Sequence, residues 1–382
     1  MTSVRPLSEA ERHAAAIAAL GAGPARTRRF LEGYEPVAAW EDLATGRHRA
    51  DPHRAYQSKA RPSLVDAVAS ACTRSGIAVR IHGRPGYPEA LIDDHEAPAI
   101  LFTLGDPSLV DSRPRVTIVG TRSATPYGLG VASELGRGLA EAGVSVVSGL
   151  ARGIDSAASA GALAVPGGAP TVAVIGTAPD AAVRRADLQL QAGIAGHGAV
   201  LSERAPGSGG APPWCFVVRN RIMAALAHVV VVVECHRQSG SLHTVKAAAD
   251  RDVLVGAVPG SVRSSASAGC NALLVDGAAP VRDVGDVLAA LELVIAGRPG
   301  IVPPDVATAS SATISTTTSV VGEAPGPLAA RTLRALDHDP ASLDTVVRRC
   351  GLPVADVAES LEQLAAVGLA VGPGGWWSRP SR

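Results

Sequence analysis

The most regular pattern of hydrophobic and polar positions lies between residues 116 and 155. A mostly apolar stretch from Val116 to Val119 precedes a glycine-bearing turn. A helical spacing of apolar residues then leads to a second apolar stretch ending at Ser148 and to another glycine-bearing turn. Short apolar runs bounded in this way are typical of parallel strands buried on both faces. The pattern therefore predicts half of a Rossmann-type unit: strand, helix and strand, each strand ending in a glycine turn.

The alternation of strands and helices continues toward residue 258. It predicts strands at 171–175, 199–202, 229–234 and 253–258, separated by helices at 156–164, 183–195, 219–226 and 241–250. Shorter strand-like pieces between Ile77 and Leu104 extend the same sheet. Short connections between alternating elements favour one fold class. We expect an α/β protein with an extended Rossmann-like, doubly wound, mostly parallel sheet.

The flanking segments have different patterns. Residues 8 to 75 are alanine-rich with helical spacing, and residues 296 to 327 are rich in Pro, Gly, Ser and Thr without an apolar period. Residues 328 to 377 read as three short helices followed by a hydrophobic turn, as in a winged helix. The predicted domains are an N-terminal helical (SAM-like) domain at 1–76, an extended Rossmann-fold domain at 77–295, a flexible linker at 296–327 and a winged-helix-like domain at 328–382.

Composition limits the kind of binding site. The 382 residues carry 35 Lys and Arg against 35 Asp and Glu, so the chain has no global charge that would attract a polyanion. Any phosphate site must be local. Nearly all the basic residues are arginines, and Lys59 and Lys246 are the two lysines. Arg26, Arg28 and Arg29 cluster beside a turn, as a nucleic-acid contact or, more commonly, as a solvated face.

Cysteine usage and hydropathy indicate the compartment. The five cysteines are scattered and form no CxxC pair, which indicates neither a zinc site nor a disulfide framework. No apolar run reaches the length of about 18 residues that a membrane-spanning helix needs. We expect a cytoplasmic protein without membrane contact, metal or cofactor.

Two strand ends predict a phosphate site. Gly120 and Arg122 follow the first strand, while Ser148, Gly149 and Arg152 follow the second. Carboxyl ends of neighbouring parallel strands share one crevice, and backbone donors with arginine attract phosphate there. The glycine spacing differs from the GxGxxG fingerprint, which disfavours NAD. For Asp155 we favour a helix cap over a ligand contact.

A third group of polar residues lies further along the chain. Arg219, Asn220 and Arg221 fall in a predicted helix, where positions 219 and 221 are roughly 200° apart. One of the two arginines should therefore face inward as a structural residue. Phe216 is the best-placed ring for base stacking, although a lone Phe before a helix is commonly a core residue. Ser239 and Gly240 follow a further strand and can bind phosphate or sugar.

Catalytic motifs are missing from the sequence. It contains no Ser-His-Asp order, HExxH, GxSxG or P-loop. Glu234 would repel phosphate and is predicted to pair with an arginine or to cap a turn rather than to act as a base. We therefore predict no catalytic residues and no enzymatic activity.

Read in order, the motifs resemble those of the DNA-processing protein A family, also called DprA or Smf. They are IVGTR at 118–122, YG at 127–128, SGLARGID at 148–155, RNR at 219–221, VVVE at 231–234, SGS at 239–241 and VPGS at 258–261. The resemblance implies a non-enzymatic homodimer that binds and protects incoming single-stranded DNA. It also implies help in loading a RecA-type recombinase during natural transformation and homologous recombination. By motif position, the pocket is lined or supported by Gly120, Arg122, Ser148, Gly149, Arg152, Arg219, Asn220, Arg221, Ser239 and Gly240.

Two other functions stay open. One is an enzyme resembling the phosphoribohydrolases, although Pro166-Gly167-Gly168 is followed by Ala169-Pro170 and lacks the GT and Glu of their PGGxGTxxE motif. The other is a nucleotide sensor whose tail binds a partner. Both predict preferential binding of a mononucleotide over an oligonucleotide.

Overall fold

The computed structural model describes residues 5–181, 185–296, 326–336, 340–372 and 376–379. The chain forms two compact units, 1–123 with 131–309, and 124–130 with 310–382. The predicted linker at 296–327 falls almost entirely outside the described residues. None of the described helices is long and apolar enough to cross a membrane.

The first unit is built on a nine-stranded sheet of order β1-β2-β6-β5-β4-β3-β7-β8-β9. The strands are β1 Ala78–Ile81, β2 Ile100–Gly105, β3 Arg115–Val119, β4 Ser145–Ser148, β5 Val172–Val174, β6 Ala199–Ser202, β7 Val229–Val232, β8 Leu254–Ala257 and β9 Ala279–Pro280. Strands β3 to β9 pair in parallel, whereas β1 and β2 add an antiparallel edge. The predicted doubly wound α/β sheet and its N-terminal extension are confirmed.

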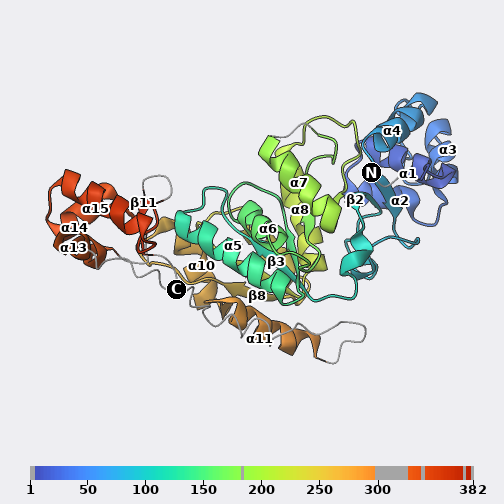
Figure 1. Cartoon of the computed structure of the whole chain (residues 1–382). Coiled ribbons are helices and arrows are strands. Elements are labelled where there is room, and N and C mark those ends of the chain that lie inside the picture. The colour runs from blue at the N-terminus through green and yellow to red at the C-terminus, as the bar shows by residue number, and fades with distance from the viewer. Residues whose placement is uncertain (1–4, 182–184, 297–325, 337–339, 373–375, 380–382) are drawn as a thin grey trace. The chain divides into compact units, whose positions relative to one another are not determined.

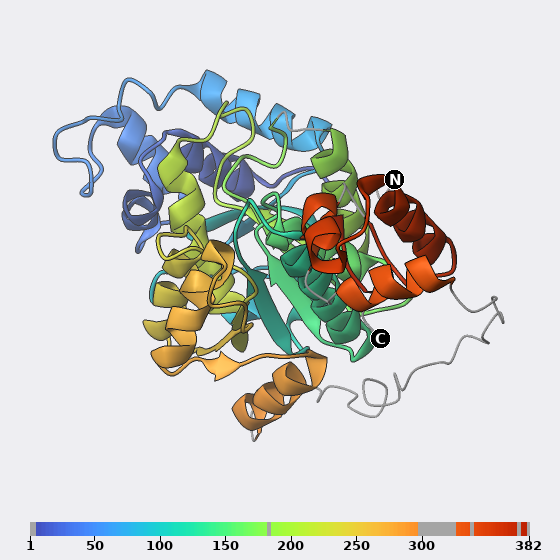
Figure 2. The same cartoon turned by 90° about the vertical axis from the view of Figure 1, so that its left-hand side faces the viewer.

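Helices cover both faces of this sheet (Figures 1 and 2). They are α5 Pro126–Glu141, α6 Ile154–Leu163, α7 Arg185–His197, α8 Pro213–Leu226, α9 Leu242–Ala249, α10 Ala268–Val275 and α11 Val284–Ile295. Helices α8 and α9 pack on each other on one face. The other face is covered by α6 with α7. The main core joins Val147 and Val230 of the sheet to Ile222 and Met223 of α8, all nearly inaccessible to water.

Four helices precede the sheet, α1 Glu9–Ala19, α2 Pro24–Leu31, α3 Pro36–Thr45 and α4 Pro62–Arg74. A capping box between Ser8 and Glu11 starts α1, and proline in the first turn starts the other three. Ala14 and Ala15 of α1 pack with Val79 and Phe102 of the antiparallel edge. The N-terminal helices are therefore joined to the sheet by a common apolar core.

The second unit contains α13 Pro327–Ala335, α14 Leu343–Cys350 and α15 Val354–Ala366. Its short antiparallel pair joins β10 Ala341–Ser342 to β11 Trp376–Trp377. Val346, Val357 and Leu361 form the centre of its own core. The sequence predicts three helices followed by a hydrophobic turn; the structure has the three helices, with β10 between α13 and α14 and β11 after α15.

The structure differs from the predicted elements in two places: α10, β9 and α11 follow the last predicted strand, and the start of α8 lies earlier than predicted. The helix begins at Pro213, six residues before the predicted start at 219. Proline in the first turn is compatible with a helix start, because the missing N–H has no partner there in any case. Phe216 therefore lies within the helix and not before it, which corrects the position that the sequence analysis assigned to it.

Candidate nucleic-acid interface

A crevice is expected where the strand order of the sheet reverses. Strands β3 and β7 are neighbours but lie far apart in the sequence, and β4 and β8 flank them. The Thr121 amide, after β3, donates to the Glu234 carbonyl, after β7, over 2.7 Å. A Cβ on Gly120 would fall within 2.8 Å of that same carbonyl oxygen, so glycine is required for this close approach. Ligands bind outside the carboxyl ends of strands at such reversals.

A carboxylate of the protein itself occupies part of the crevice. Asp155 is buried, and its Oδ2 accepts a hydrogen bond from the Gly149 amide over 3.1 Å. The Ala151 and Gly120 amides also stabilise the charged form. Desolvation nevertheless dominates and raises the pKa of Asp155 to about 6, against the attraction of Arg219. Backbone donors predicted to hold phosphate thus already hold this carboxylate.

The predicted helix-cap role of Asp155 is wrong. The N-cap residue of α6 is Gly153, which makes no side-chain cap, and Asp155 lies inside the first turn. Its side chain turns back to the ends of β3 and β4 because their free amides offer several donors at once. Asp155 therefore fixes the two strand-end turns relative to one another.

Arg219 is the buried cation that faces this carboxylate. Its Nη1 donates to the Gly149 carbonyl over 2.6 Å and also to the Val174 carbonyl. Burial lowers the pKa of Arg219 to about 10, although Asp155 favours its charged form. The guanidinium thus ties the ends of β4 and β5 to α8. The sequence analysis expected one inward-facing arginine, whereas the structure largely buries Arg221 as well.

Several of the other predicted site residues are buried and bonded within the protein. Ser148 is buried, and its hydroxyl donates to the Ile118 carbonyl over 2.8 Å. Asn220 donates to the Gly240 carbonyl over 3.3 Å. Arg221 pairs with Glu203 over 2.7 Å, with 12% and 15% of the two side chains exposed. Ser148, Gly149, Asn220 and both arginines of α8 therefore support the crevice rather than present free groups.

Arg122 and Arg152 are the exposed cations of the strand-end turns. The Arg122 guanidinium lies over the Phe216 ring, 5.3 Å from its centroid. This is the geometry of a cation–π contact, and it brings together the ring and the charge that the sequence singled out. Ser239 is half-buried with its hydroxyl 2.8 Å from that of Ser241, and Gly240 is exposed.

The sequence analysis did not identify two residues that lie on or beside α8. The partner of Arg221 is Glu203, which directly follows β6, and Trp214 stands 48% exposed in the first turn of α8. The Pro212-Pro213 pair was the signal for the early start of α8 and for Trp214. No local pattern identifies Glu203, because its partner lies on another element.

Comparison with known proteins gives matches over both units. Residues 78–292 match the family model described as DNA recombination-mediator protein A, and residues 318–364 match the DprA winged helix domain. A Mycobacterium tuberculosis DprA relative is 44% identical over 193 residues, which are 50% of this chain and 49% of that protein. The match thus spans about half of that relative's length.

Solved structures agree with this assignment. The X-ray structure of DNA processing protein A from Streptococcus pneumoniae has a TM-score of 0.63 and 32% identity, covering 74% of this chain and 98% of that one. A Helicobacter pylori DprA structure, described for its single-stranded DNA binding mode, has a TM-score of 0.50 and 27% identity, covering 56% of this chain and 95% of that one. The predicted resemblance is confirmed, and the chain belongs to the DNA recombination-mediator protein A (DprA/Smf) family of DNA-processing proteins.

Proposed function

We propose that this protein binds single-stranded DNA in the crevice between the β3 and β7 ends. The observation that carries the proposal is the exposed Arg122 guanidinium lying over the Phe216 ring at the reversal of the strand order. Arg122 and Arg152 supply charge for phosphates, while Phe216 supplies a ring for a base. The single-stranded DNA of the Helicobacter pylori relative supports the same ligand here.

Two features of the crevice argue against an enzyme acting on nucleotides. The Glu234 side chain is 1% exposed and Asp155 is 5% exposed, so neither carboxylate is accessible to a bound substrate. Asp155 instead accepts hydrogen bonds from backbone amides of the strand ends. We therefore infer a binding protein rather than a nucleotide hydrolase.

The wider role that we propose is protection of incoming single strands and help in loading a RecA-type recombinase, by a homodimer, during DNA uptake. The cytoplasm is the proposed place of action, because the five cysteines are free and buried as in a reducing compartment. Stimulated recombinase assembly on strands coated with single-strand-binding protein tests the loading role, and sedimentation tests the dimer.

The binding test uses Arg122→Ala and fluorescence anisotropy with a labelled single strand at several salt concentrations. Log affinity should fall with log salt at about −0.7 per phosphate neutralised, and the variant should lose roughly one such unit of slope. Competition by duplex DNA and by AMP should be weak. Preferential binding of AMP by the wild type would favour the nucleotide-sensor alternative.

Arg137→Ala is the matched control. Arg137 is also exposed but lies on α5, about 16 Å along the helix axis from its first residue and so away from the crevice. This variant should keep the wild-type slope. If Arg122→Ala also kept it, Arg122 would have no contact with phosphate.

A further inference from the structure

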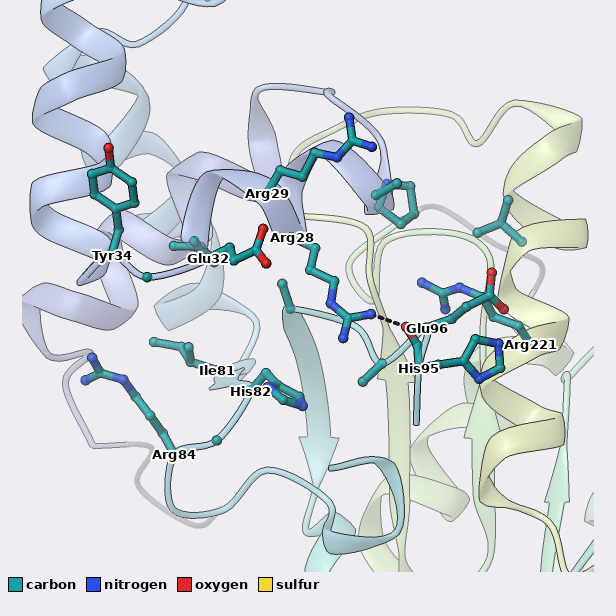
Figure 3. A pocket seen from close by; sticks show the side chains of 18 of the residues that line it. Arg28, Arg29, Glu32, Tyr34, Ile81, His82, Arg84, His95, Glu96 and Arg221 are labelled. Carbon is teal, nitrogen blue, oxygen red and sulfur yellow. Dashed lines mark hydrogen bonds between the residues drawn. The ribbon is translucent and has the colours of Figure 1, made fainter. Parts of the chain in front are cut away.

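A large cavity lies beside α8 and α9, at the junction with the N-terminal helices (Figure 3). Its volume is about 1140 Å³. It is lined by α2, by the connection between β1 and β2, and by the outer sides of α8 and α9. Pockets for single small ligands measure about 300–1,000 Å³, so this space suits a segment of an extended polymer.

The cavity shares two helices, α8 and α9, with the proposed DNA crevice. Helices α8 and α9 both begin beside the crevice, where Asn220 bonds to the Gly240 carbonyl. Val217 and Arg221 of α8 and Lys246 of α9 then line the cavity. Lys246 lies four residues into α9, about 6 Å along its axis, so a strand leaving the crevice reaches the cavity within one or two nucleotides.

The lining has cations without an acidic partner. No ion pair involves Arg28, Arg29 or Lys246 within the described part of the chain. Arg28 reaches across from α2 and donates to the His95 backbone carbonyl, which uses one of its five donors (Figure 3).

The acids of the lining are partly neutralised within the protein. Glu35 pairs with Arg84, and Glu96 pairs with Arg251 over 3.0 Å. Glu32 and Asp250 remain as exposed acids in the lining. The positive excess is therefore small, which matches contact with one or two phosphates rather than with a long polyanion.

The cavity offers little for reading bases. Tyr34 lines the cavity, but its ring is stacked on the His48 ring, with 4.6 Å between the centroids. The Arg49 guanidinium also lies over the Tyr34 ring, 5.2 Å from its centroid. Figure 3 shows the Tyr34 ring directed away from Arg28 and the opposite wall. Contacts here should therefore be to the sugar-phosphate backbone and independent of base sequence.

We propose that this cavity is a second subsite for the same single strand, which binds the backbone as it leaves the crevice. The proposal rests on the proposed function and adds a role for the N-terminal helices, whose Arg28 and Arg29 form one wall. DNA longer than the crevice gains affinity from the cavity, whereas DNA that only fills the crevice does not.

The test compares oligothymidylates of about 6 and about 16 nucleotides, the range of single-strand sites on one domain, by fluorescence anisotropy with the full chain. Lys246→Ala should weaken the longer strand about three- to tenfold at low salt. It should also lower the salt slope by roughly 0.7 and leave the shorter strand unchanged. Oligocytidylates of the same lengths should show the same loss of affinity and the same change in salt slope.

Arg28→Ala should act in the same direction, with thermal unfolding as a check because Arg28 also bridges to His95. Lys246 is exposed, and its side chain forms no hydrogen bond or ion pair within the described residues, so Lys246→Ala is the decisive variant if Arg28→Ala is unstable. Arg26→Ala is the control, because Arg26 lies on the same helix but over the Tyr56 ring, outside the cavity lining.

The outcomes separate the two proposals. Equal binding of the longer strand by wild type and Lys246→Ala would overturn the second subsite while leaving the crevice intact. Both proposals are supported if Arg122→Ala weakens binding of both strands and Lys246→Ala weakens binding of the longer strand alone. Failure of the wild type to bind either strand would remove the proposed function and the subsite with it.

Discussion

At the scale of single residues, the crevice is organised by a buried carboxylate and a buried guanidinium that attract each other. Asp155 and Arg219 are each almost inaccessible to water, and each has a pKa displaced toward its neutral form by desolvation. Together the two side chains hold three backbone segments, the ends of β3, β4 and β5, through hydrogen bonds, so their burial cost is offset by contacts that only these strand ends offer. Arg122 and Arg152 remain free for a ligand because Asp155 and Arg219 satisfy the backbone beneath them.

Asp155→Asn should change how stability depends on pH. The folded-state pKa of about 6 exceeds the ordinary value of 3.8. Between these values the folded protein keeps a proton that the unfolded chain has lost, so the contribution of Asp155 to stability falls as pH rises through that window. The wild type should lose about 3 kcal/mol relative to the variant between pH 4 and 7, as measured by urea unfolding.

Asp66→Asn serves as the comparison for this measurement. Asp66 pairs with Arg12 on the surface, with 70% of its side chain exposed. The stability of Asp66→Asn should depend on pH as that of the wild type does, since exposed ion pairs contribute little to stability. Parallel curves for the wild type and Asp155→Asn would show that Asp155 is not the titrating group.

At the scale of elements, the separation of α5 and α6 sets the distance between the two arginine-bearing turns that precede them. A Cβ on Gly136 of α5 would overlap the Ala158 carbonyl of α6, and a Cβ on Gly161 of α6 would overlap the Ser133 carbonyl of α5. The glycines are thus needed for close helix packing and not for a turn. The spacing of the crevice depends on this contact.

Gly136→Ala should lower the free energy of unfolding by about 1–3 kcal/mol, because the added methyl group forces the two helices apart. Gly130→Ala in the same helix meets no atom within 4 Å. It should stabilise the protein by about 0.5–1 kcal/mol through helix propensity. Chemical denaturation measures the free energy of unfolding of both variants. A stabilising Gly136→Ala would mean that α5 and α6 can accommodate a methyl group without moving apart.

At the scale of the whole molecule, the winged-helix unit has a core of its own. Its core residues all lie between Ala329 and Trp377, and none belongs to the sheet. Both of the proposed DNA subsites are built from the first unit. The two units therefore divide into a body that carries both proposed DNA subsites and a separate small domain.

Removal of residues 326–382 should leave a folded protein that binds short single strands within about twofold of the full chain, because the crevice residues keep all their described partners. Circular dichroism tests whether the shortened protein is folded, and fluorescence anisotropy tests its affinity for short single strands. A large loss of short-strand affinity with native secondary structure would indicate that the winged helix contributes to the crevice.

The sequence by itself determined the sheet, most element positions, the family and the residues that gather at the strand ends. Periodicity and glycine turns are local signals, and parallel strands bring their carboxyl ends together whatever the side-chain details. The tertiary structure alone decided that Asp155 fills the amide-lined turns, that Arg219 is buried while Arg122 is free, and that Arg28 and Lys246 share a cavity. Each of these depends on which distant elements pack together and exclude water, and no local pattern encodes that packing.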